Sequence, residues 1–131
     1  MGVLIMGTRA IYCMKYKIGY LGAWQWLDAN NIRLDYLNRH FNNRVAVLDF
    51  LKQGEWDVMG TRKNMQSILD GCKATPYRMT ECNGVYFVKR PESMKKAPVF
   101  YKDLETLLGQ DVNFVFMFDS KTHKWKKQRT Y

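Results

Sequence analysis

The residue types that most often carry acid–base or nucleophilic chemistry are few and scattered in this chain. Its two histidines, His40 and His123, lie far apart in the sequence and neither has a nucleophile close to it. The sequence contains no GxSxG turn, no phosphate-binding loop, no GxGxxG and no HExxH. Four acidic residues are candidate acids, although solvated surface carboxylates are the default explanation: Asp28, Asp35, Glu55 and Asp57. We therefore predict a protein that is not an enzyme and has no catalytic residues.

Metal and cofactor sites are equally unsupported. The three cysteines, Cys13, Cys72 and Cys82, are odd in number and none is paired in a CxxC spacing. Together with two separated histidines they form no zinc-binding pattern. Free thiols are typical of a reducing compartment, so we expect a cytoplasmic protein without a metal or a cofactor. No apolar run approaches the ~18 residues that a membrane span requires, and we expect no membrane partner.

Charge points to the class of partner. The chain carries 21 basic and 12 acidic residues, a formal net charge of +9. Such an excess attracts phosphorylated or polyanionic ligands over long distances, although it also serves solubility. Residues 121–131 contain five basic residues and no acidic ones. We expect this basic C-terminal segment to contribute attraction more than folding.

Aromatic side chains offer a way to hold a planar ligand. Tyr20, Trp24 and Trp26 alternate on one face of an expected strand, and Tyr12 and Tyr16 are expected on its neighbour. Such a row could stack bases, at about 1–3 kcal/mol for each stack. The alternative is that these rings pack against helices in the core.

The tetrapeptide Met-Gly-Thr-Arg occurs twice, with different flanks, so we treat the two copies separately. In the second copy Thr61 is a natural helix cap, and Arg62 and Lys63 follow in the first turn. Two cations oppose the helix dipole there and become favourable if an anion binds; the alternative is that both are merely solvated.

The first copy begins an alternating strand and places Arg9 at its start. Arg9 either clamps a ligand or pairs with a carboxylate, for which Asp28 and Asp119 are the expected partners. Arg78 and Arg90 flank a further strand pattern, where guanidinium groups suit bidentate phosphate contacts. An ordinary edge strand with solvated basic side chains explains them equally well.

Periodicity indicates the elements that position these residues. Strand patterns occupy 8–16, 20–27, 84–91, 112–119 and 124–129. Helical patterns occupy 32–41, 43–54, 62–70 and 101–110. We predict an α+β fold in which N- and C-terminal hairpins form an antiparallel sheet and three to four short helices pack mainly on one face. Residues 1–131 are expected to form a single domain.

A longer series of short motifs carries a family resemblance. "MGTRAIY" begins a strand, "WQWLD" follows, and two helical patterns end in "LKQGE"; near the C-terminus an aromatic strand reaches Phe-Asp, a turn and Trp125. This arrangement resembles small phage and prophage proteins of unassigned role, in which a Trp-Asp-Gly-Tyr-Pro segment follows the Gly-Thr-Arg strand. The chain retains Trp and Asp but lacks Gly-Tyr-Pro. The resemblance implies a phage accessory protein with an anti-defence role, acting in the host cell cytoplasm.

These observations together predict a non-enzymatic protein that sequesters a small phosphorylated or nucleotide-like ligand, with an immune signalling nucleotide as the case that the resemblance suggests. The expected ligand-binding residues are Arg9, Trp24, Trp26, Arg62, Lys63, Arg78 and Arg90. Two alternatives stay open, a nucleic-acid-binding protein with a basic and aromatic surface and a protein–protein inhibitor of a host factor. Assembly into a homo-oligomer also stays open.

Overall fold

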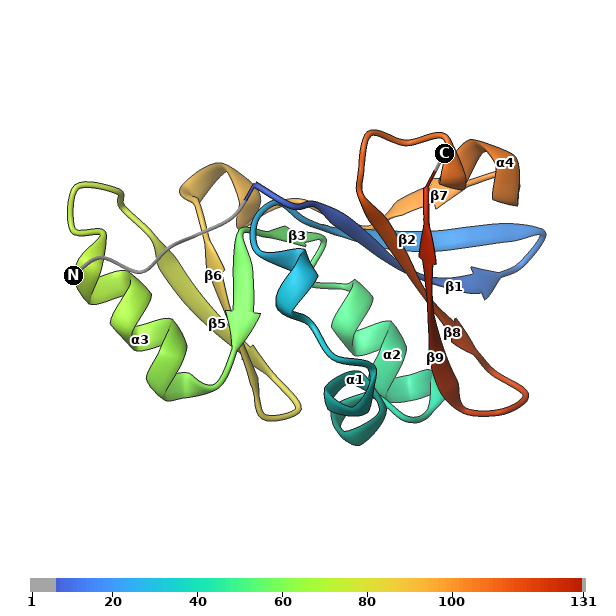
Figure 1. Ribbon diagram of the computed structural model, residues 1–131, viewed down its shortest axis with the longest axis horizontal. Coiled ribbons are helices and arrows are strands. Elements are labelled where there is room, and N and C mark those ends of the chain that lie inside the picture. Colours follow the sequence, from blue (N-terminus) through green and yellow to red (C-terminus); the bar gives the residue numbers. More distant parts are fainter. Residues whose placement is uncertain (1–6, 131) are drawn as a thin grey trace.

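The computed structural model describes residues 7–130 and divides them between a large sheet and a small sheet (Figure 1). The strands are β1 (Ala10–Tyr16), β2 (Gly19–Gln25), β3 (Glu55–Trp56), β4 (Val58–Gly60), β5 (Arg78–Cys82), β6 (Val85–Lys89), β7 (Val99–Tyr101), β8 (Phe114–Asp119) and β9 (Lys124–Arg129). The helices are α1 (Leu34–His40), α2 (Arg44–Leu51), α3 (Arg62–Gly71) and α4 (Leu104–Leu108), with 3₁₀ turns η1 (Ala29–Asn31) and η2 (Pro91–Ser93). The α+β class predicted from the sequence is confirmed.

The large sheet joins the two terminal hairpins. Strands β1 and β2 form one antiparallel hairpin and strands β8 and β9 form the other. The hairpins meet through a parallel pairing of β1 with β8, which places Ala10 opposite Phe114. Strands β3 and β7 both add to the outer edge of β2, β3 in parallel and β7 antiparallel. The sheet is therefore mixed where the hairpins join, a pairing that periodicity does not encode.

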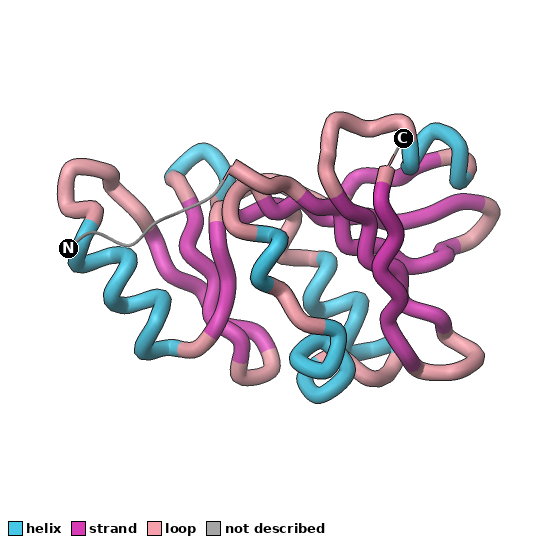
Figure 2. The backbone as a smooth tube through the Cα atoms, in the orientation of Figure 1, coloured by secondary structure: helices cyan, strands magenta, loops and turns pink. Residues whose placement is uncertain are grey.

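The small sheet has the order β4-β6-β5, and α3 packs against it through Met65 and Ile68, which contact Val58 and Val88. The sequence predicted β6 and α3 but neither β4 nor β5. Strand β5 reads Arg-Met-Thr-Glu-Cys, which has too little apolar alternation to stand out from a loop. The small sheet and α3 lie at one end of the molecule, and the turns of the two terminal hairpins lie at the other (Figure 2).

Helix starts follow the caps expected from the sequence. The Asn43 side chain accepts a hydrogen bond from the Ala46 amide at 2.9 Å, and Thr61 accepts one from the Asn64 amide at 3.2 Å. Each cap satisfies a backbone donor that the first helical turn leaves unpaired. Thr61 thereby fixes where α3 begins, at the edge of the small sheet.

An aromatic core connects the two sheets. The Tyr12 ring stacks on Phe116 with 4.9 Å between centroids and contacts Phe50 and Trp56 at 5.2 and 5.5 Å. Phe87 of the small sheet joins the same cluster, because it lies edge-on to Trp56 at 4.9 Å. Helices α1 and α2 cover this face of the large sheet, and α4 covers the opposite face beside Ile11.

The register of β1 and β2 corrects one expectation. Ile11 lies opposite Trp24 and Tyr12 lies opposite Ala23. Directly opposed residues in a sheet share a face. Trp24 therefore points away from the Tyr12 face, and the predicted continuous row of tyrosines and tryptophans does not form.

No helix within residues 7–130 has the length and apolar character needed to cross a membrane.

Candidate functional site

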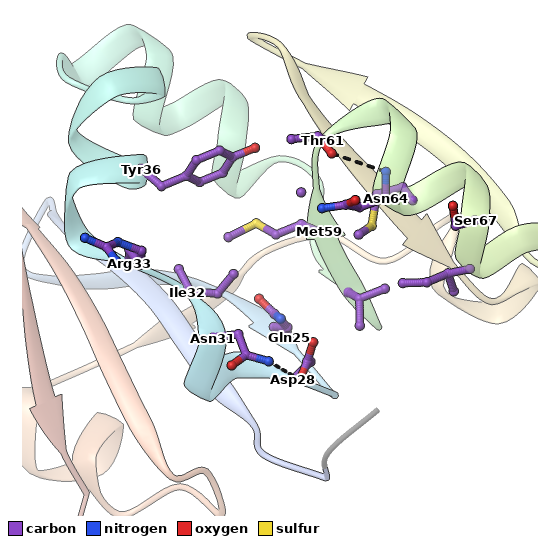
Figure 3. A pocket seen from close by; sticks show the side chains of 14 residues that line it. Gln25, Asp28, Asn31, Ile32, Arg33, Tyr36, Met59, Thr61, Asn64 and Ser67 are labelled. Carbon is purple, nitrogen blue, oxygen red and sulfur yellow. Dashed lines mark hydrogen bonds between the residues drawn. The ribbon is translucent and has the colours of Figure 1, made fainter. Parts of the chain in front are cut away.

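A cleft of about 440 Å³ lies where the small sheet and α3 face the segment that runs from η1 into α1 (Figure 3). One wall comes from residues 28–36 and the other from the end of β4 and the first turns of α3. Its lining residues are Gln25, Asp28, Asn31, Ile32, Arg33, Tyr36, Val58, Met59, Gly60, Thr61, Asn64, Met65, Ser67 and Ile68. This volume lies in the range of small-molecule sites.

The hydroxyl of Tyr36 is the feature of the cleft that internal structure does not explain. The Tyr36 side chain extends from α1 toward Thr61 on the opposite wall (Figure 3). Its hydroxyl oxygen is fully buried and has no hydrogen-bond partner among the described residues. Burial raises the pKa of Tyr36, so the hydroxyl keeps its proton and is a donor. A buried hydroxyl without a partner costs about 1–3 kcal/mol, which a polar ligand would recover.

Further hydrogen-bonding capacity faces the same space. The Asn64 side-chain amide has no partner within residues 7–130, although its backbone amide is held by Thr61. One carboxylate oxygen of Asp28 accepts a hydrogen bond from the Asn31 side chain at 2.6 Å. The other oxygen accepts no hydrogen bond from the described residues. The cleft therefore offers an amide, a phenol and a carboxylate oxygen that converge from two walls.

Apolar side chains line the remaining surface of the cleft. Ile32 comes from the η1–α1 segment, and Met59, Met65 and Ile68 come from β4 and α3. Met65 and Ile68 are nearly inaccessible, with 5% and 6% exposure, so they form a fixed floor. Thioether sulfurs contact aromatic rings favourably, and such a lining suits a flat heterocycle.

The backbone around Asp28 is fixed in an unusual conformation. Asp28 has φ of 63°, in the left-handed region that most residues other than glycine avoid. The loop is held by the Ala29 amide, which donates to the Thr8 carbonyl at 3.1 Å, and by the Thr8 hydroxyl, which donates to Asn30 at 2.8 Å. Thr8 of the first Gly-Thr-Arg segment thus positions a wall of the cleft.

A buried ion pair fixes the small sheet against the large one. The Asp57 carboxylate, 4% exposed, accepts from Arg90 Nε at 3.1 Å and from the Tyr77 hydroxyl at 2.8 Å. Burial and the adjoining Asp57 carboxylate raise the pKa of Tyr77 to about 12. The Leu27 amide also donates to the Asp57 carbonyl at 2.9 Å, so the network links the end of β2 to the small sheet. It sets the spacing of the two walls.

Arg9 pairs with a carboxylate, but the expected partner was wrong. Its guanidinium lies 3.2 Å from Asp111 in the loop before β8, not beside Asp28 or Asp119. The reason is the parallel pairing of β1 with β8, which brings the start of β8 rather than its end next to the start of β1. The Asp111 side chain is 87% exposed, so this pair contributes little to stability.

Trp24 and Trp26 lie side by side, with ring centroids 5.2 Å apart, in a different cavity of about 500 Å³. The Trp24 indole donates to the Tyr101 hydroxyl at 2.7 Å and the Trp26 indole donates to the Glu55 carboxylate. The Arg90 guanidinium lies 5.9 Å from the Trp26 ring centroid. Three of the predicted residues, both tryptophans and Arg90, therefore come together, but their polar groups are already paired.

The other predicted residues are separate from this group. Arg62 and Lys63 are exposed in the first turn of α3, next to Thr61 at the edge of the cleft. Arg78 is exposed at the start of β5, which lies at an edge of the small sheet and pairs with β6. Asp28 was named from the sequence only as a candidate acid, and Tyr36 and Asn64 were missed as cleft residues. No sequence signal identifies Tyr36 and Asn64, because a missing hydrogen-bond partner is visible only once the chain is folded.

Within residues 7–130 no group of three or more His, Cys, Asp or Glu side chains is arranged to hold a metal ion. The three cysteines are free thiols, with Cys13 and Cys82 buried. A scan against protein-family models finds no match for the chain, and searches of curated proteins and of solved structures find none either. The resemblance to small phage proteins stays a prediction.

Proposed function

We propose that the protein is a non-enzymatic binding protein that captures a small nucleotide-like ligand in the cleft between α1 and α3. The observation that carries the proposal is the buried Tyr36 hydroxyl, which has no partner within residues 7–130 and belongs to a side chain that lines this cleft. A folded chain rarely leaves such a group unsatisfied without water, a ligand or a functional reason.

The groups of the cleft match the chemistry of a nucleobase. An amide such as Asn64 both donates and accepts, and a carboxylate such as Asp28 accepts from ring or exocyclic N–H groups. Apolar contacts from Ile32 and Met59 suit the faces of a heterocycle. We infer that the base lies in the cleft with its polar edge toward Asn64 and Tyr36.

The beginning of α3 suits the phosphate of such a ligand. Thr61 lines the cleft, and the first helical turn carries Arg62 and Lys63 without any acidic residue. A helix N-terminus attracts anions through its free amides and its dipole. A phosphate group that extends from the bound ligand toward this side lies near both cations. This is the anion at the helix start for which the sequence made Arg62 and Lys63 favourable.

The resemblance to small phage proteins extends this proposal to the biology. Under that reading the ligand is an immune signalling nucleotide and the protein lowers its free concentration in the host cell.

Thermal-shift screening tests the proposal. The probes are nucleoside monophosphates, cyclic dinucleotides and ADP-ribose, with single-stranded DNA as the polymer control. We expect one probe class to raise the melting temperature of the wild-type protein, and Asn64→Ala to weaken that probe's binding about 3- to 10-fold, the value of one hydrogen bond.

Gln66→Ala is the matched control, because Gln66 is exposed on the same helix, bonds to Asp70 and does not line the cleft. Equal effects of Asn64→Ala and Gln66→Ala would contradict the assignment, as would a panel in which no nucleotide binds. Stronger binding of single-stranded DNA than of every small probe would favour the nucleic-acid alternative.

A further inference from the structure

Five cationic side chains surround a second hollow at the opposite end of the large sheet from the small sheet. Lys15 and Lys17 come from the β1–β2 hairpin, Lys121 and Lys126 from the β8–β9 hairpin, and Arg44 from the start of α2. The hollow has a volume of about 440 Å³, and Tyr20, Met117 and Phe118 form apolar parts of its surface. We call these eight positions, together with Asp119 and Ser120, the lysine hollow.

The positive charge of the lysine hollow is not neutralised internally. None of its five cations has a carboxylate within 4.0 Å among residues 7–130, although five such ion pairs occur elsewhere in that part of the chain. Its single acidic residue, Asp119, accepts a hydrogen bond from the Lys121 amide at 2.8 Å. That bond, with a second backbone amide and nearby lysines, lowers the pKa of Asp119, so the carboxylate stays charged near neutral pH. The hollow keeps four net positive charges, five cations against one carboxylate.

Two of the cations are held in place by an aromatic ring. Lys17 Nζ lies 5.5 Å and the Arg44 guanidinium 5.8 Å from the centroid of the Tyr16 ring. Cation–π contact orders these side chains without consuming their hydrogen-bonding capacity for an anion. Lys17 also has φ of 54° in the hairpin turn, where glycine or asparagine is the usual choice. A lysine there places a cation at the hollow and bears a conformational cost.

We propose that the lysine hollow binds a compact anion with several phosphate groups, such as a short inorganic polyphosphate or a multiply phosphorylated small molecule. Cations without carboxylate partners, gathered between two hairpins and a helix start, provide several charge-assisted hydrogen bonds at once. The hollow does not share a lining residue with the cleft at α3, so this site is independent of the proposed function.

The sheet face on which each cation lies distinguishes a compact anion from a nucleic acid. Successive residues of β9 point to opposite faces of the sheet. Lys126 lines the hollow, whereas Lys127 Nζ lies 4.0 Å from the Phe114 ring centroid and Arg129 lies 5.7 Å from it, on the other face. A compact anion contacts Lys126 and not Lys127 or Arg129. A polymer attracted to the whole basic strand would use all of them.

Isothermal titration calorimetry with tripolyphosphate tests the proposal on two double variants of equal charge. Lys15→Gln with Lys126→Gln removes two cations from the hollow, and Lys127→Gln with Arg129→Gln removes two cations from the opposite face. We expect the first pair to lower tripolyphosphate affinity at least tenfold and the second to lower it less than threefold. All four side chains are exposed or half-exposed, and thermal unfolding of each variant verifies that it is folded.

Three results would overturn the proposal. The first is absence of tripolyphosphate binding by the wild-type protein at 50 mM salt. The second is an equal loss in both double variants, which would indicate diffuse attraction to the charge of the chain. The third is tighter binding of a single-stranded oligonucleotide than of tripolyphosphate, with both double variants equally impaired.

Discussion

The cleft at α3 and the lysine hollow have similar volumes and opposite chemistry. The cleft offers a phenol, an amide and a carboxylate oxygen around apolar side chains, and its most informative group is a buried hydroxyl without a partner. The hollow offers five exposed cations around one carboxylate. The first selects by shape and hydrogen bonding, and the second attracts by charge. The difference indicates two sites that distinct experiments can separate.

A substitution in the ion-pair network beside the cleft should affect the cleft and leave the hollow unchanged. Arg90→Ala removes the cationic partner of the buried Asp57 carboxylate and leaves Asp57 with only the neutral Tyr77 hydroxyl as a side-chain partner among the described residues. We expect the free energy of unfolding to fall by about 2–4 kcal/mol, measured by chemical denaturation. Ligand binding at the cleft should weaken as well, because this network sets the distance between the two walls of the cleft.

Tripolyphosphate affinity of folded Arg90→Ala should stay within threefold of the wild type, because the hollow lies at the other end of the sheet. A parallel loss at both sites would show that the two regions are not independent.

Salt dependence separates the two sites in the wild-type protein. Between 50 and 200 mM salt we expect tripolyphosphate affinity to fall about tenfold or more, because exposed charges are screened and ions are released. Affinity for a nucleotide in the cleft should fall less than threefold over the same range. Calorimetry at both salt concentrations measures each value, and equal slopes would place both ligands on one charged surface.

Alkaline pH tests the network that spaces the cleft walls. The pKa of Tyr77 is raised to about 12 from an ordinary value near 10, so the folded state favours the neutral phenol. Its contribution to stability is complete below pH 10 and is lost as pH rises from 10 toward 12. Denaturation at pH 9, 10 and 11 should therefore show a smaller decline for Tyr77→Phe than for the wild type. Identical declines would mean that folding does not raise the pKa of Tyr77.

Substitution of Lys17 should have the smallest effect of these changes, and it tests whether this lysine serves binding at the hollow. Replacing it by glycine relieves the positive φ, so we expect unfolding free energy to be unchanged or higher by up to about 1 kcal/mol. Tripolyphosphate affinity should fall about threefold. Denaturation and calorimetry on the same sample measure both, and a loss of stability would remove the argument that this lysine is present for binding.

Much of the fold was predictable because local rules decided it. Alternation across residues 8–16 specified β1, and Asn43 and Thr61 began α2 and α3 as capping chemistry requires. Gly54 follows α2 with φ of 74°, a backbone conformation that favours glycine. These features depend on a few neighbouring residues.

What was not predictable depended on partners distant in sequence. The parallel pairing of β1 with β8 decided that Arg9 meets Asp111, and the register of β1 with β2 sent Trp24 away from Tyr12. The basic tail was visible as a run of charge, yet only the alternation of β9 divides it into Lys126 at the hollow and Lys127 on the other face. Tyr36 carried no signal at all, since its importance is the absence of a partner.

Nuclear magnetic resonance on the ¹⁵N-labelled protein tests whether a nucleotide-like ligand lies in the cleft. The N–H signals of the Asn64 side chain and of the Trp24 and Trp26 indoles report on two different cavities in one spectrum. On titration with the nucleotide that gives the largest thermal shift, we expect the Asn64 side-chain amide to move and both indole signals to stay. Movement of the indole signals with an unchanged Asn64 amide would place the ligand beside the tryptophans and contradict the account.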